Sequence, residues 1–491
     1  MSNIKTSIAL FKSQLSNLNP RFYFRQNEID IIVNPNEFYA LLKDKISKAE
    51  ERVFLASLYL GKNENELVDS ISDALKKNSN LKVYILLDGL RGTREAPKSC
   101  SASLLSPLVR DFDNRVDIRF YKTPALTIFK KKLLPKRFIE GIGLQHMKIY
   151  GVDNEVILSG ANLSSDYFSN RQDRYYLFKS KPFSEYYFKI HQLISSMSYK
   201  LMYSNTNAST FKLIWPKTNS INNSMRKHQF LRDSSKILNE FLHSKNFNIN
   251  DNFSKFELNE NEYPTVVYPV SQFTPLFKKN QDYSTEKPSI LKMLEGIEKL
   301  PKIKWSFTAG YFNMHPDIKT KLLTVPAKHG CIITASPQAN GFYKSKGVSS
   351  MLPDAYLLLS KKFLKDCHKY GMNDKIQLKE WKKGIVNEPN GWSYHAKGIW
   401  LSPDANDNEG DFPFITTIGS SNYTKRAYSL DLETDAIVMT SDPILREKMN
   451  QELNNITKNC KDVNLEDFKN DPERNIGLGT RIATKILGGK L

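Results

Sequence analysis

The chain has 491 residues, of which 40% are hydrophobic, and it carries 71 Lys and Arg against 52 Asp and Glu. The formal net charge of +19 favours an anionic partner, whether a nucleic acid, a membrane surface or a phosphorylated substrate. No stretch approaches the roughly 18 unbroken apolar residues of a membrane span, which excludes a polytopic membrane protein. The four cysteines are far apart and form no CxxC pair, which argues against a disulfide framework or a zinc site.

The N-terminal segment, residues 1–27, contains no acidic residue. Its apolar positions from Ile4 to Leu18 recur at helical spacing and form one face. An amphipathic, acid-free start is typical of a mitochondrial targeting segment, and an ordinary surface helix is the alternative. We therefore expect residues 1–27 to direct import into the mitochondrion.

Two further segments combine basic and aliphatic residues without an acid, residues 121–138 and the part of the C-terminal tail 456–491 that follows Asn475. This mixture suits the headgroup region of an anionic membrane, and a solvated basic loop beside the core is the alternative. No interleaved pattern of aromatic and basic residues for binding bases is evident. We expect peripheral contact with an anionic membrane and no nucleic acid.

In chain order, the predicted elements describe the same plan twice. The first copy has a strand from residue 30, a helix near 36–50 and strands at 53–60 and 83–87. The second has a strand from residue 265, a helix near 289–300 and strands at 305–312 and 331–335. Alternating strands and helices predict an α/β fold with mixed sheets flanked by helices, duplicated into two lobes. We place the lobes at 28–202 and 262–455, with a polar connector or insertion at 203–261.

The strongest match between the halves is a His-x-Lys segment that enters a β-hairpin. His146 and Lys148 stand in the first copy, and His395 and Lys397 stand in the second. Residues i and i+2 of a strand share a face, so each His and Lys are expected to project together. One such segment is usually a half-buried His beside a surface Lys, whereas two copies in a duplicated context indicate a site.

Each hairpin ends in an Asn, and a carboxylate follows eleven residues later. The pairs are Asn162 with Asp173 and Asn422 with Glu433. An active site at the pseudo-two-fold interface would gather two imidazoles, two ammonium groups and two amides, which suits a phosphate without a metal or cofactor. One imidazole can attack phosphorus while the other moves a proton, and the two carboxylates are placed to accept the second ring N–H of each His. We add Ser420 to the candidate substrate-binding residues.

The sequence His146-x-Lys148-x4-Asp153, with the following Ser-Gly-Ala-Asn, resembles the HKD signature of the phospholipase D superfamily. Four segments, 86–94, 143–150, 170–176 and 394–400, resemble more narrowly the mitochondrial CDP-diacylglycerol–glycerol-3-phosphate 3-phosphatidyltransferase family, and its fungal members most closely.

The second copy departs from the signature, because Ser402 occupies the position that matches Asp153. Asp153 belongs to the candidate catalytic set through the resemblance. Its place at the hairpin turn predicts that it stabilises the turn and the setting of the lysine.

The resemblance implies transfer of a phosphatidyl group from CDP-diacylglycerol to sn-glycerol 3-phosphate through a phosphoryl-histidine, releasing CMP, in phosphatidylglycerol and cardiolipin biosynthesis. It implies a site on the matrix side of the inner mitochondrial membrane. We assign His146 as nucleophile and His395 as acid and base, although the symmetry allows the reverse. Arg91 and Arg94, in a turn after a predicted strand, are expected to hold the acceptor's phosphate or the donor's pyrophosphate, with a surface turn as the alternative. Oligomeric state stays open.

Three rival functions fit part of the pattern. A hydrolase of the same superfamily, either a phospholipase D or a nucleic-acid phosphodiesterase, would also explain the charge. A phosphatidylserine synthase of the HKD type shares the donor but needs no arginines for an acceptor phosphate. A catalytically inactive lipid-binding scaffold is disfavoured because both copies keep their His, Lys, Asn and carboxylate.

Overall fold

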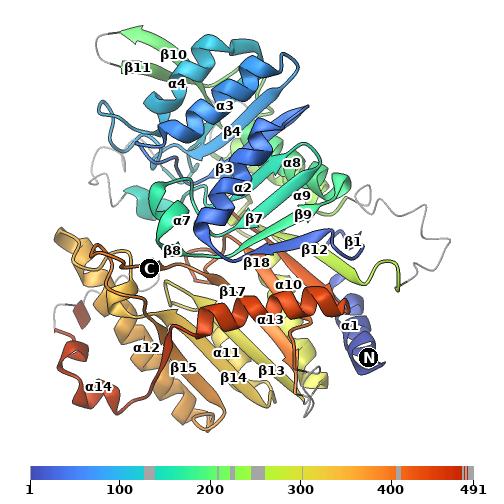
Figure 1. The fold of residues 1–491 in the computed structure, drawn as a ribbon, viewed down its shortest axis with the longest axis vertical. Coiled ribbons are helices and arrows are strands. Elements are labelled where there is room, and N and C mark those ends of the chain that lie inside the picture. Colours follow the sequence, from blue (N-terminus) through green and yellow to red (C-terminus); the bar gives the residue numbers. More distant parts are fainter. Residues whose placement is uncertain are drawn as a thin grey trace.

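Two nine-stranded mixed sheets, each flanked by helices, form the two lobes of this computed structural model (Figure 1). The structure describes residues 2–126, 139–206, 209–221, 227–244, 260–300, 302–404, 411–477, 480, 481 and 484. The mixed α/β architecture and its duplication confirm the predicted fold class.

The first lobe uses residues from the first half of the chain. Its elements are β2 (Ile29–Ile32), α2 (Pro35–Ser47), β3 (Arg52–Ser57), α3 (Asn65–Lys77), β4 (Lys82–Asp88), α4 (Ser101–Asp111), β5 (Val116–Tyr121), β6 (Ile149–Val152), β7 (Glu155–Ser159), α7 (Ser165–Ser169), β8 (Arg171–Gln172), β9 (Tyr175–Lys179), α8 (Lys181–Ser195), β10 (Tyr199–Thr206) and β11 (Ser209–Ile214).

The second lobe repeats this order. Its elements are β12 (Thr265–Gln272), α10 (Glu286–Gly296), β13 (Ile303–Ala309), α11 (Pro316–Thr324), β14 (His329–Ala335), α12 (Leu352–Lys369), β15 (Ile376–Trp381), β16 (Ser393–Tyr394), β17 (Lys397–Pro403), β18 (Ile415–Gly419), β19 (Glu433–Thr440), α13 (Pro443–Thr457), β20 (Cys460–Val463) and α14 (Asp467–Asn470).

The sheets correspond strand for strand. The order β2-β9-β7-β6-β3-β4-β5-β10 in the first lobe matches β12-β19-β18-β17-β13-β14-β15-β20 in the second. In each, three parallel strands lie beside an antiparallel hairpin, β6–β7 or β17–β18, and this hairpin follows the His-x-Lys segment. The predicted strands and helices are thereby confirmed, although both histidines lie just before the regular strand, which begins at Ile149 and at Lys397.

Buried apolar side chains stabilise each lobe and also hold the two lobes together. Strands β7, β18 and β19 are buried along almost their whole length, as expected for strands covered on both faces. A core cluster spans the two lobes, because Met147 and Ile149 of the first pack with Leu432 and Ala436 of the second. The interface between the lobes is therefore part of one continuous apolar core, and Met147 of the first His-x-Lys segment lies in it.

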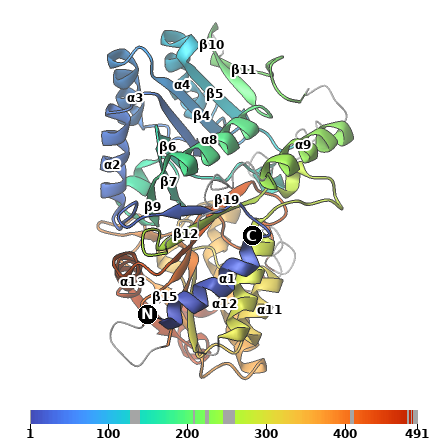
Figure 2. The same cartoon turned by 90° about the vertical axis from the view of Figure 1, so that its right-hand side faces the viewer.

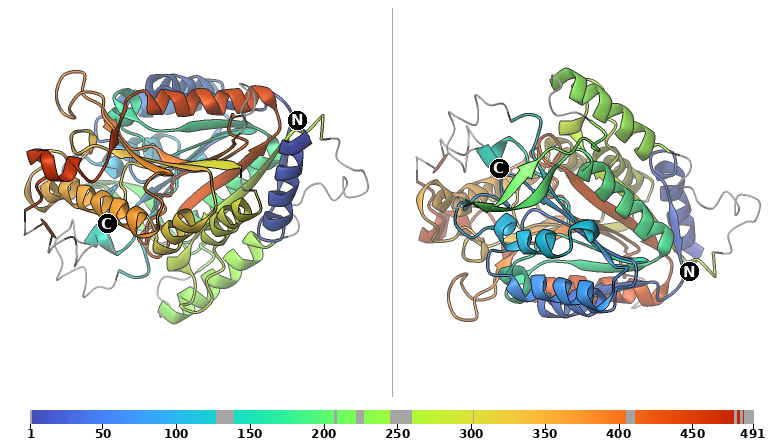
Figure 3. Two further views of the ribbon diagram at one scale, coloured as in Figure 1. Left: turned by 90° about the horizontal axis from the view of Figure 1, so that it is seen from below. Right: turned by 90° about the horizontal axis from the view of Figure 1, so that it is seen from above.

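The N-terminal segment is part of the second lobe. Helix α1 (Ser2–Leu15) lies along the second lobe (Figures 2 and 3) and packs on α10. Its Phe11 is fully buried, and the ring of Phe11 lies 6.1 Å from that of Phe414. Strand β1 (Phe22–Phe24) pairs with β12 at the edge of the second sheet. The apolar face that the sequence shows is thus a core face, and the boundary that we placed at residue 27 does not separate it from the folded lobe. Its role in targeting stays a prediction.

The segment that we called a connector contains regular structure. Strand β10 pairs with β5 and β11, and α9 (Lys227–Leu242) contains the helix expected near 231–242. The C-terminal boundary at 455 also falls inside α13, and β20 beyond it pairs with β15. Most of the basic segment 121–138 lies outside the described residues. In the described part of the chain, no helix combines the length and apolarity that a membrane crossing needs.

Candidate active site

Each His-x-Lys segment pairs with a short stretch of main chain in the opposite lobe. Strand β16 pairs with β8, and the His395 amide donates to the carbonyl of Gln172 at 2.9 Å. In the pseudo-symmetric position, Gln145 bridges to Leu432, and the His146 amide donates to the carbonyl of Leu432 at 2.9 Å. The main chain of each histidine is therefore hydrogen-bonded to the residue directly before the candidate carboxylate of the other lobe.

The two imidazoles pair crosswise with these carboxylates. Nδ1 of His146 lies 2.9 and 3.0 Å from the two carboxylate oxygens of Glu433, and Nδ1 of His395 lies 2.6 Å from Oδ2 of Asp173. A carboxylate that accepts Nδ1–H leaves the lone pair on Nε2, the tautomer that a nucleophile or a base needs.

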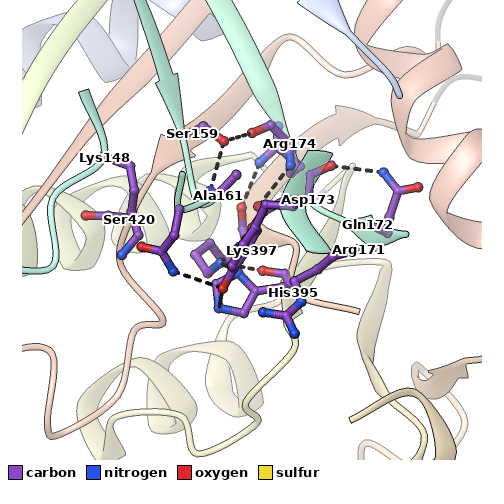
Figure 4. A network of polar contacts seen from close by, with 12 residues as sticks. Lys148, Ser159, Ala161, Arg171, Gln172, Asp173, Arg174, His395, Lys397 and Ser420 are labelled. Carbon is purple, nitrogen blue, oxygen red and sulfur yellow. Dashed lines mark hydrogen bonds and ion pairs between the residues drawn. The ribbon is translucent and has the colours of Figure 1, made fainter. Parts of the chain in front are cut away.

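The two lysines are almost completely buried, and Figure 4 shows Lys397 beside His395. Nζ of Lys148 donates to the carbonyl of His146 at 2.6 Å. Nζ of Lys397 contacts the carbonyl of His395, lies 2.7 Å from its Nδ1 and lies 3.4 Å from Oδ2 of Asp173. The structure thus brings both His-Lys pairs and both carboxylates to one region of the lobe interface.

The amides and Ser420 complete this region. Nδ2 of Asn162 donates to the hydroxyl of Tyr167 at 3.0 Å, and that hydroxyl lies 3.4 Å from Nε2 of His395. Ser420 donates to Oε2 of Glu433 at 2.5 Å, so it acts through the carboxylate that holds His146. The buried Oδ1 of Asn422 accepts no hydrogen bond within the described structure.

Burial dominates the electrostatics. It lowers the pKa of both histidines well below the usual value, lowers the pKa of Lys148 to about 7 and lowers that of Lys397. Both imidazoles are therefore neutral near pH 7, as a nucleophile and a base require.

The two carboxyl groups differ. Burial raises the pKa of Glu433 to about 8, and Lys148 opposes this shift only in part. Burial also acts to raise the pKa of Asp173, but Lys397 and His395 outweigh it and hold the pKa below its usual value. His395 consequently faces an ionised partner at neutral pH, while the partner of His146 titrates near pH 8.

Asp153 lies at the turn between β6 and β7 and contacts neither imidazole. It has a positive φ of 49°, and its carboxylate accepts the amides of Glu50, Glu51 and Arg52 at 2.8 to 2.9 Å. This carboxylate fixes the turn against the start of β3. Because the side chain is committed to these three amides, we leave Asp153 out of the catalytic set. Its counterpart Ser402 lies in β17 and pairs with β13.

The contacts of the turn arginines are with other side chains than the two histidines. Arg94 forms an ion pair with Glu140. The guanidinium of Arg91 lies 4.2 Å from the ring centroid of Tyr59, at a cavity of about 330 Å³ that Glu64 also lines. Both arginines therefore have carboxylate partners, since Arg91 also lies 3.5 Å from Glu95, and Arg91 in addition borders the cavity.

Sequence reasoning missed four residues of this region. The rings of Tyr167 and Tyr311 lie 5.2 and 5.4 Å from that of His395, and Arg171 lies over Tyr167 at 4.4 Å. A Cβ on Gly160 would lie 2.5 Å from both Oδ1 of Asp173 and Nζ of Lys397, so any side chain there would displace these two groups. Arg171 had a signal, since it stands in the segment 170–176 directly before the candidate carboxylate.

A metal centre has no obvious ligands here. Over the part of the chain that the structure describes, no three His, Cys, Asp or Glu side chains are grouped as metal ligands. That the reaction needs no metal stays a prediction.

Comparison with known proteins gives the family. A family model described as "Cardiolipin synthase, PLD-like domain" matches residues 42–193. The CDP-diacylglycerol–glycerol-3-phosphate 3-phosphatidyltransferase of Saccharomyces cerevisiae is 59% identical over 98% of this chain and 91% of its own length. The human enzyme of that name, labelled mitochondrial, is 31% identical over 96% of this chain and 84% of its own length.

Among solved structures, phosphatidylserine synthase from Haemophilus influenzae Rd KW20 superposes with a TM-score of 0.67 over 98% of both chains, at 18% identity, and so shares the fold. Relatives this similar over nearly the whole length show that the chain belongs to the CDP-diacylglycerol–glycerol-3-phosphate 3-phosphatidyltransferase family.

Proposed function

We propose that this chain transfers the phosphatidyl group of CDP-diacylglycerol to sn-glycerol 3-phosphate, which gives phosphatidylglycerophosphate and CMP. The observation that carries the proposal is the crosswise pairing of two neutral histidines, His146 with Glu433 and His395 with Asp173, beside two buried lysines. The names of the relatives support the choice of substrates.

The first step is attack by Nε2 of His146 on the phosphorus that carries diacylglycerol. An N–P bond forms, the bond from that phosphorus to the bridging oxygen breaks, and CMP leaves with the electron pair. A phosphate monoester has a second pKa near 6, so CMP departs with little need for protonation at neutral pH. A neutral His395 is therefore no obstacle to this step.

In the second step the 1-hydroxyl of glycerol 3-phosphate attacks the phosphoryl-histidine. Nε2 of His395 takes the hydroxyl proton, a P–O bond forms, and the N–P bond breaks to restore neutral His146. Asp173, 2.6 Å from Nδ1, stabilises the imidazolium that forms at His395. The ionised state of Asp173 and the neutral state of His395 fit this role as base.

Lys148, Lys397 and the amides of Asn162 and Asn422 would hold the non-bridging oxygens of the transferred phosphate. Inside a site of low dielectric constant such donors stabilise developing charge far better than they do in water. An anionic phosphate would also restore the charged form of Lys148, whose pKa burial lowers to about 7 in the free enzyme.

We further propose that the enzyme acts in the mitochondrion, on the matrix side of the inner membrane, in phosphatidylglycerol and cardiolipin synthesis. Relatives from chicken, mouse and human are named mitochondrial. The net charge of +19 supports peripheral docking on an anionic bilayer, which would bring a lipid substrate to the lobe interface.

The test is a product assay on purified protein with CDP-diacylglycerol, in EDTA, with either glycerol 3-phosphate or serine as acceptor. We expect phosphatidylglycerophosphate and CMP with glycerol 3-phosphate, and no phosphatidylserine. Hydrolysis alone, phosphatidylserine as the product, or no release of CMP would each refute the proposal. His146→Ala and His395→Ala should both abolish turnover, and the variant that still traps a phosphatidyl-enzyme retains the nucleophile.

A further inference from the structure

A pair of opposite charges occurs in reversed order in the two lobes. Four and nine residues after Asn162 stand Asp166 and Arg171, whereas Arg426 and Asp431 stand at the same intervals after Asn422. Each pair makes an ion pair within its own lobe. The charge of Arg171 acts on His395 and that of Arg426 acts on His146, so each histidine has an arginine in its surroundings, but from different positions of the repeat.

In the second lobe the pair is part of the framework. Nε of Arg426 lies 2.8 Å from Asp431, whose side chain is only 7% exposed. The other carboxylate oxygen of Asp431 accepts the amide of Leu144 at 2.9 Å, and Arg426 donates to the carbonyl of Glu140 at 2.9 Å. Both charges are thus used to hold the segment that leads to His146.

In the first lobe the arginine is buried and its acid is not. The side chain of Arg171 is 13% exposed, while that of Asp166 is 64% exposed and lies 3.3 Å away. Nε of Arg171 donates to the hydroxyl of Ser393 at 2.8 Å, which fixes the guanidinium. An ion pair with a solvent-exposed carboxylate has little Coulomb energy, so the positive charge of Arg171 stays largely uncompensated.

This charge faces the proposed base. Arg171 lies over Tyr167, whose ring contacts His395, and Figure 4 draws Arg171 beside His395. A Cβ on Gly341 would lie 3.2 Å from Nη2 of Arg171 and 3.4 Å from the hydroxyl of Tyr311, so the backbone of this loop also approaches the guanidinium closely. Nη2 donates to the exposed carboxylate of Asp166 at 3.3 Å, and the aromatic and main-chain neighbours bring no further negative charge, so a buried anion would be a stronger partner for the guanidinium fork.

In the proposed two-step reaction, Arg171 lies on the side from which the acceptor approaches. In successive in-line displacements, the acceptor enters on the side of phosphorus that CMP has left, opposite the nucleophile. With His146 as nucleophile, that side is the side of His395 and Arg171.

We propose that Arg171 binds the phosphate of glycerol 3-phosphate, and before it the phosphate of departing CMP, and so selects a phosphorylated acceptor. This inference rests on the proposed function. Phosphate binding, which the sequence predicts for Arg91 and Arg94, is thereby assigned to Arg171.

The test is a competition between glycerol 3-phosphate and molar glycerol for the phosphatidyl group in one reaction with CDP-diacylglycerol. Phosphatidylglycerophosphate, phosphatidylglycerol and the hydrolysis product phosphatidate are measured together. Because all acceptors draw on the same donor-loaded enzyme, the product ratio is independent of the donor step and of the fraction of folded protein.

We expect Arg171→Gln to lower the ratio of phosphatidylglycerophosphate to the other two products by about 10- to 100-fold, as for loss of a charge-assisted bidentate contact. Arg171→Lys, which keeps the charge without the fork, should fall between that variant and the wild type. Asp166→Asn, the matched control, should keep at least the wild-type ratio, because it removes only the exposed carboxylate.

An unchanged ratio in Arg171→Gln would overturn the inference, as would a fall in Arg91→Gln but not in Arg171→Gln. If Arg171→Gln makes no product at all, an unchanged ratio in Arg171→Lys has the same meaning. A wild-type protein that forms no phosphatidylglycerophosphate would instead refute the proposed function.

Discussion

Asp173→Asn tests the proposed role of His395 as base with a change of one atom. Oδ1 of Asp173 accepts the amide of Arg174 at 2.9 Å, and Oδ2 lies 2.6 Å from Nδ1 of His395. In the variant, the amide oxygen must keep facing the Arg174 N–H, because two donors cannot face each other. The new NH2 group then faces Nδ1, which must accept, and the imidazole proton moves to Nε2.

A histidine that carries its proton on Nε2 cannot take a proton from the acceptor hydroxyl. General-base catalysis is worth about 10²- to 10⁴-fold, and the corresponding change in a Ser-His-Asp site costs about 10⁴-fold. We therefore expect kcat with glycerol 3-phosphate to fall by about 10³- to 10⁴-fold, a barrier increase of about 4 to 5.5 kcal/mol.

The assay is release of CMP and formation of phosphatidylglycerophosphate at saturating substrates, with thermal unfolding to show that the variant is folded. Asp166→Asn makes the same chemical change at a side chain that is 64% exposed, and it should keep kcat within about threefold of the wild-type value. A folded Asp173→Asn protein with more than a tenth of wild-type kcat would refute the assignment of Asp173 and His395.

Three further outcomes follow from the same contacts. First, kcat/KM for CDP-diacylglycerol should peak between pH 7 and 8. Glu433, whose pKa is raised to about 8, must lose its proton to leave Nε2 of His146 free, whereas Lys148, whose pKa is lowered to about 7, loses its charge as pH rises. Lys148→Arg should lose the alkaline decline, and a wild type with no pH dependence would contradict this prediction. Second, Glu452→Gln should lower the free energy of unfolding in urea by about 3 to 5 kcal/mol. In the wild type the buried guanidinium of Arg174 lies 2.7 Å from the Glu452 carboxylate, and the variant removes that charge. A change under 1 kcal/mol would show that the main-chain carbonyls around Arg174 are enough to stabilise its charge. Phe11→Ala should cost about 3 kcal/mol in the same assay, whereas a segment that merely targets the protein would show no change.

The sequence predicts the repeat well because short-range sequence patterns determine the repeated elements. Apolar runs and amphipathic periods locate the parallel strands and their helices, and the duplicated His-x-Lys segments locate the hairpins. What the sequence does not reveal is long-range pairing. The apolar face of α1 reads as a targeting helix, since nothing local shows that Phe11 contacts Phe414 some four hundred residues later.

The same distinction holds within the candidate site. The equal spacing from Asn162 to Asp173 and from Asn422 to Glu433 shows that each carboxylate belongs to a histidine, but spacing cannot say to which. Arg171 lies in the segment 170–176, yet the sequence predicts no role for it, because its importance depends on how exposed Asp166 is. Burial and exposure are properties of the assembled lobes.

The crosswise arrangement makes the two duplicated halves depend on each other. A carboxylate from its own lobe would let each histidine be oriented by local sequence alone. Here His146 takes its carboxylate from β19 and His395 takes its own from the segment between β8 and β9, so each half supplies what the other lacks. The buried guanidinium of Arg174 reinforces this exchange, since it leaves the first lobe to bind the carbonyl of Lys397 and the carboxylate of Glu452 in the second. The same contacts orient the imidazoles and join the lobes, and they give the two His-x-Lys segments different electrostatic surroundings. Burial raises the pKa of Glu433 to about 8, whereas Lys397 and His395 hold the pKa of Asp173 below its usual value, which is the asymmetry that the proposed nucleophile and the proposed base require.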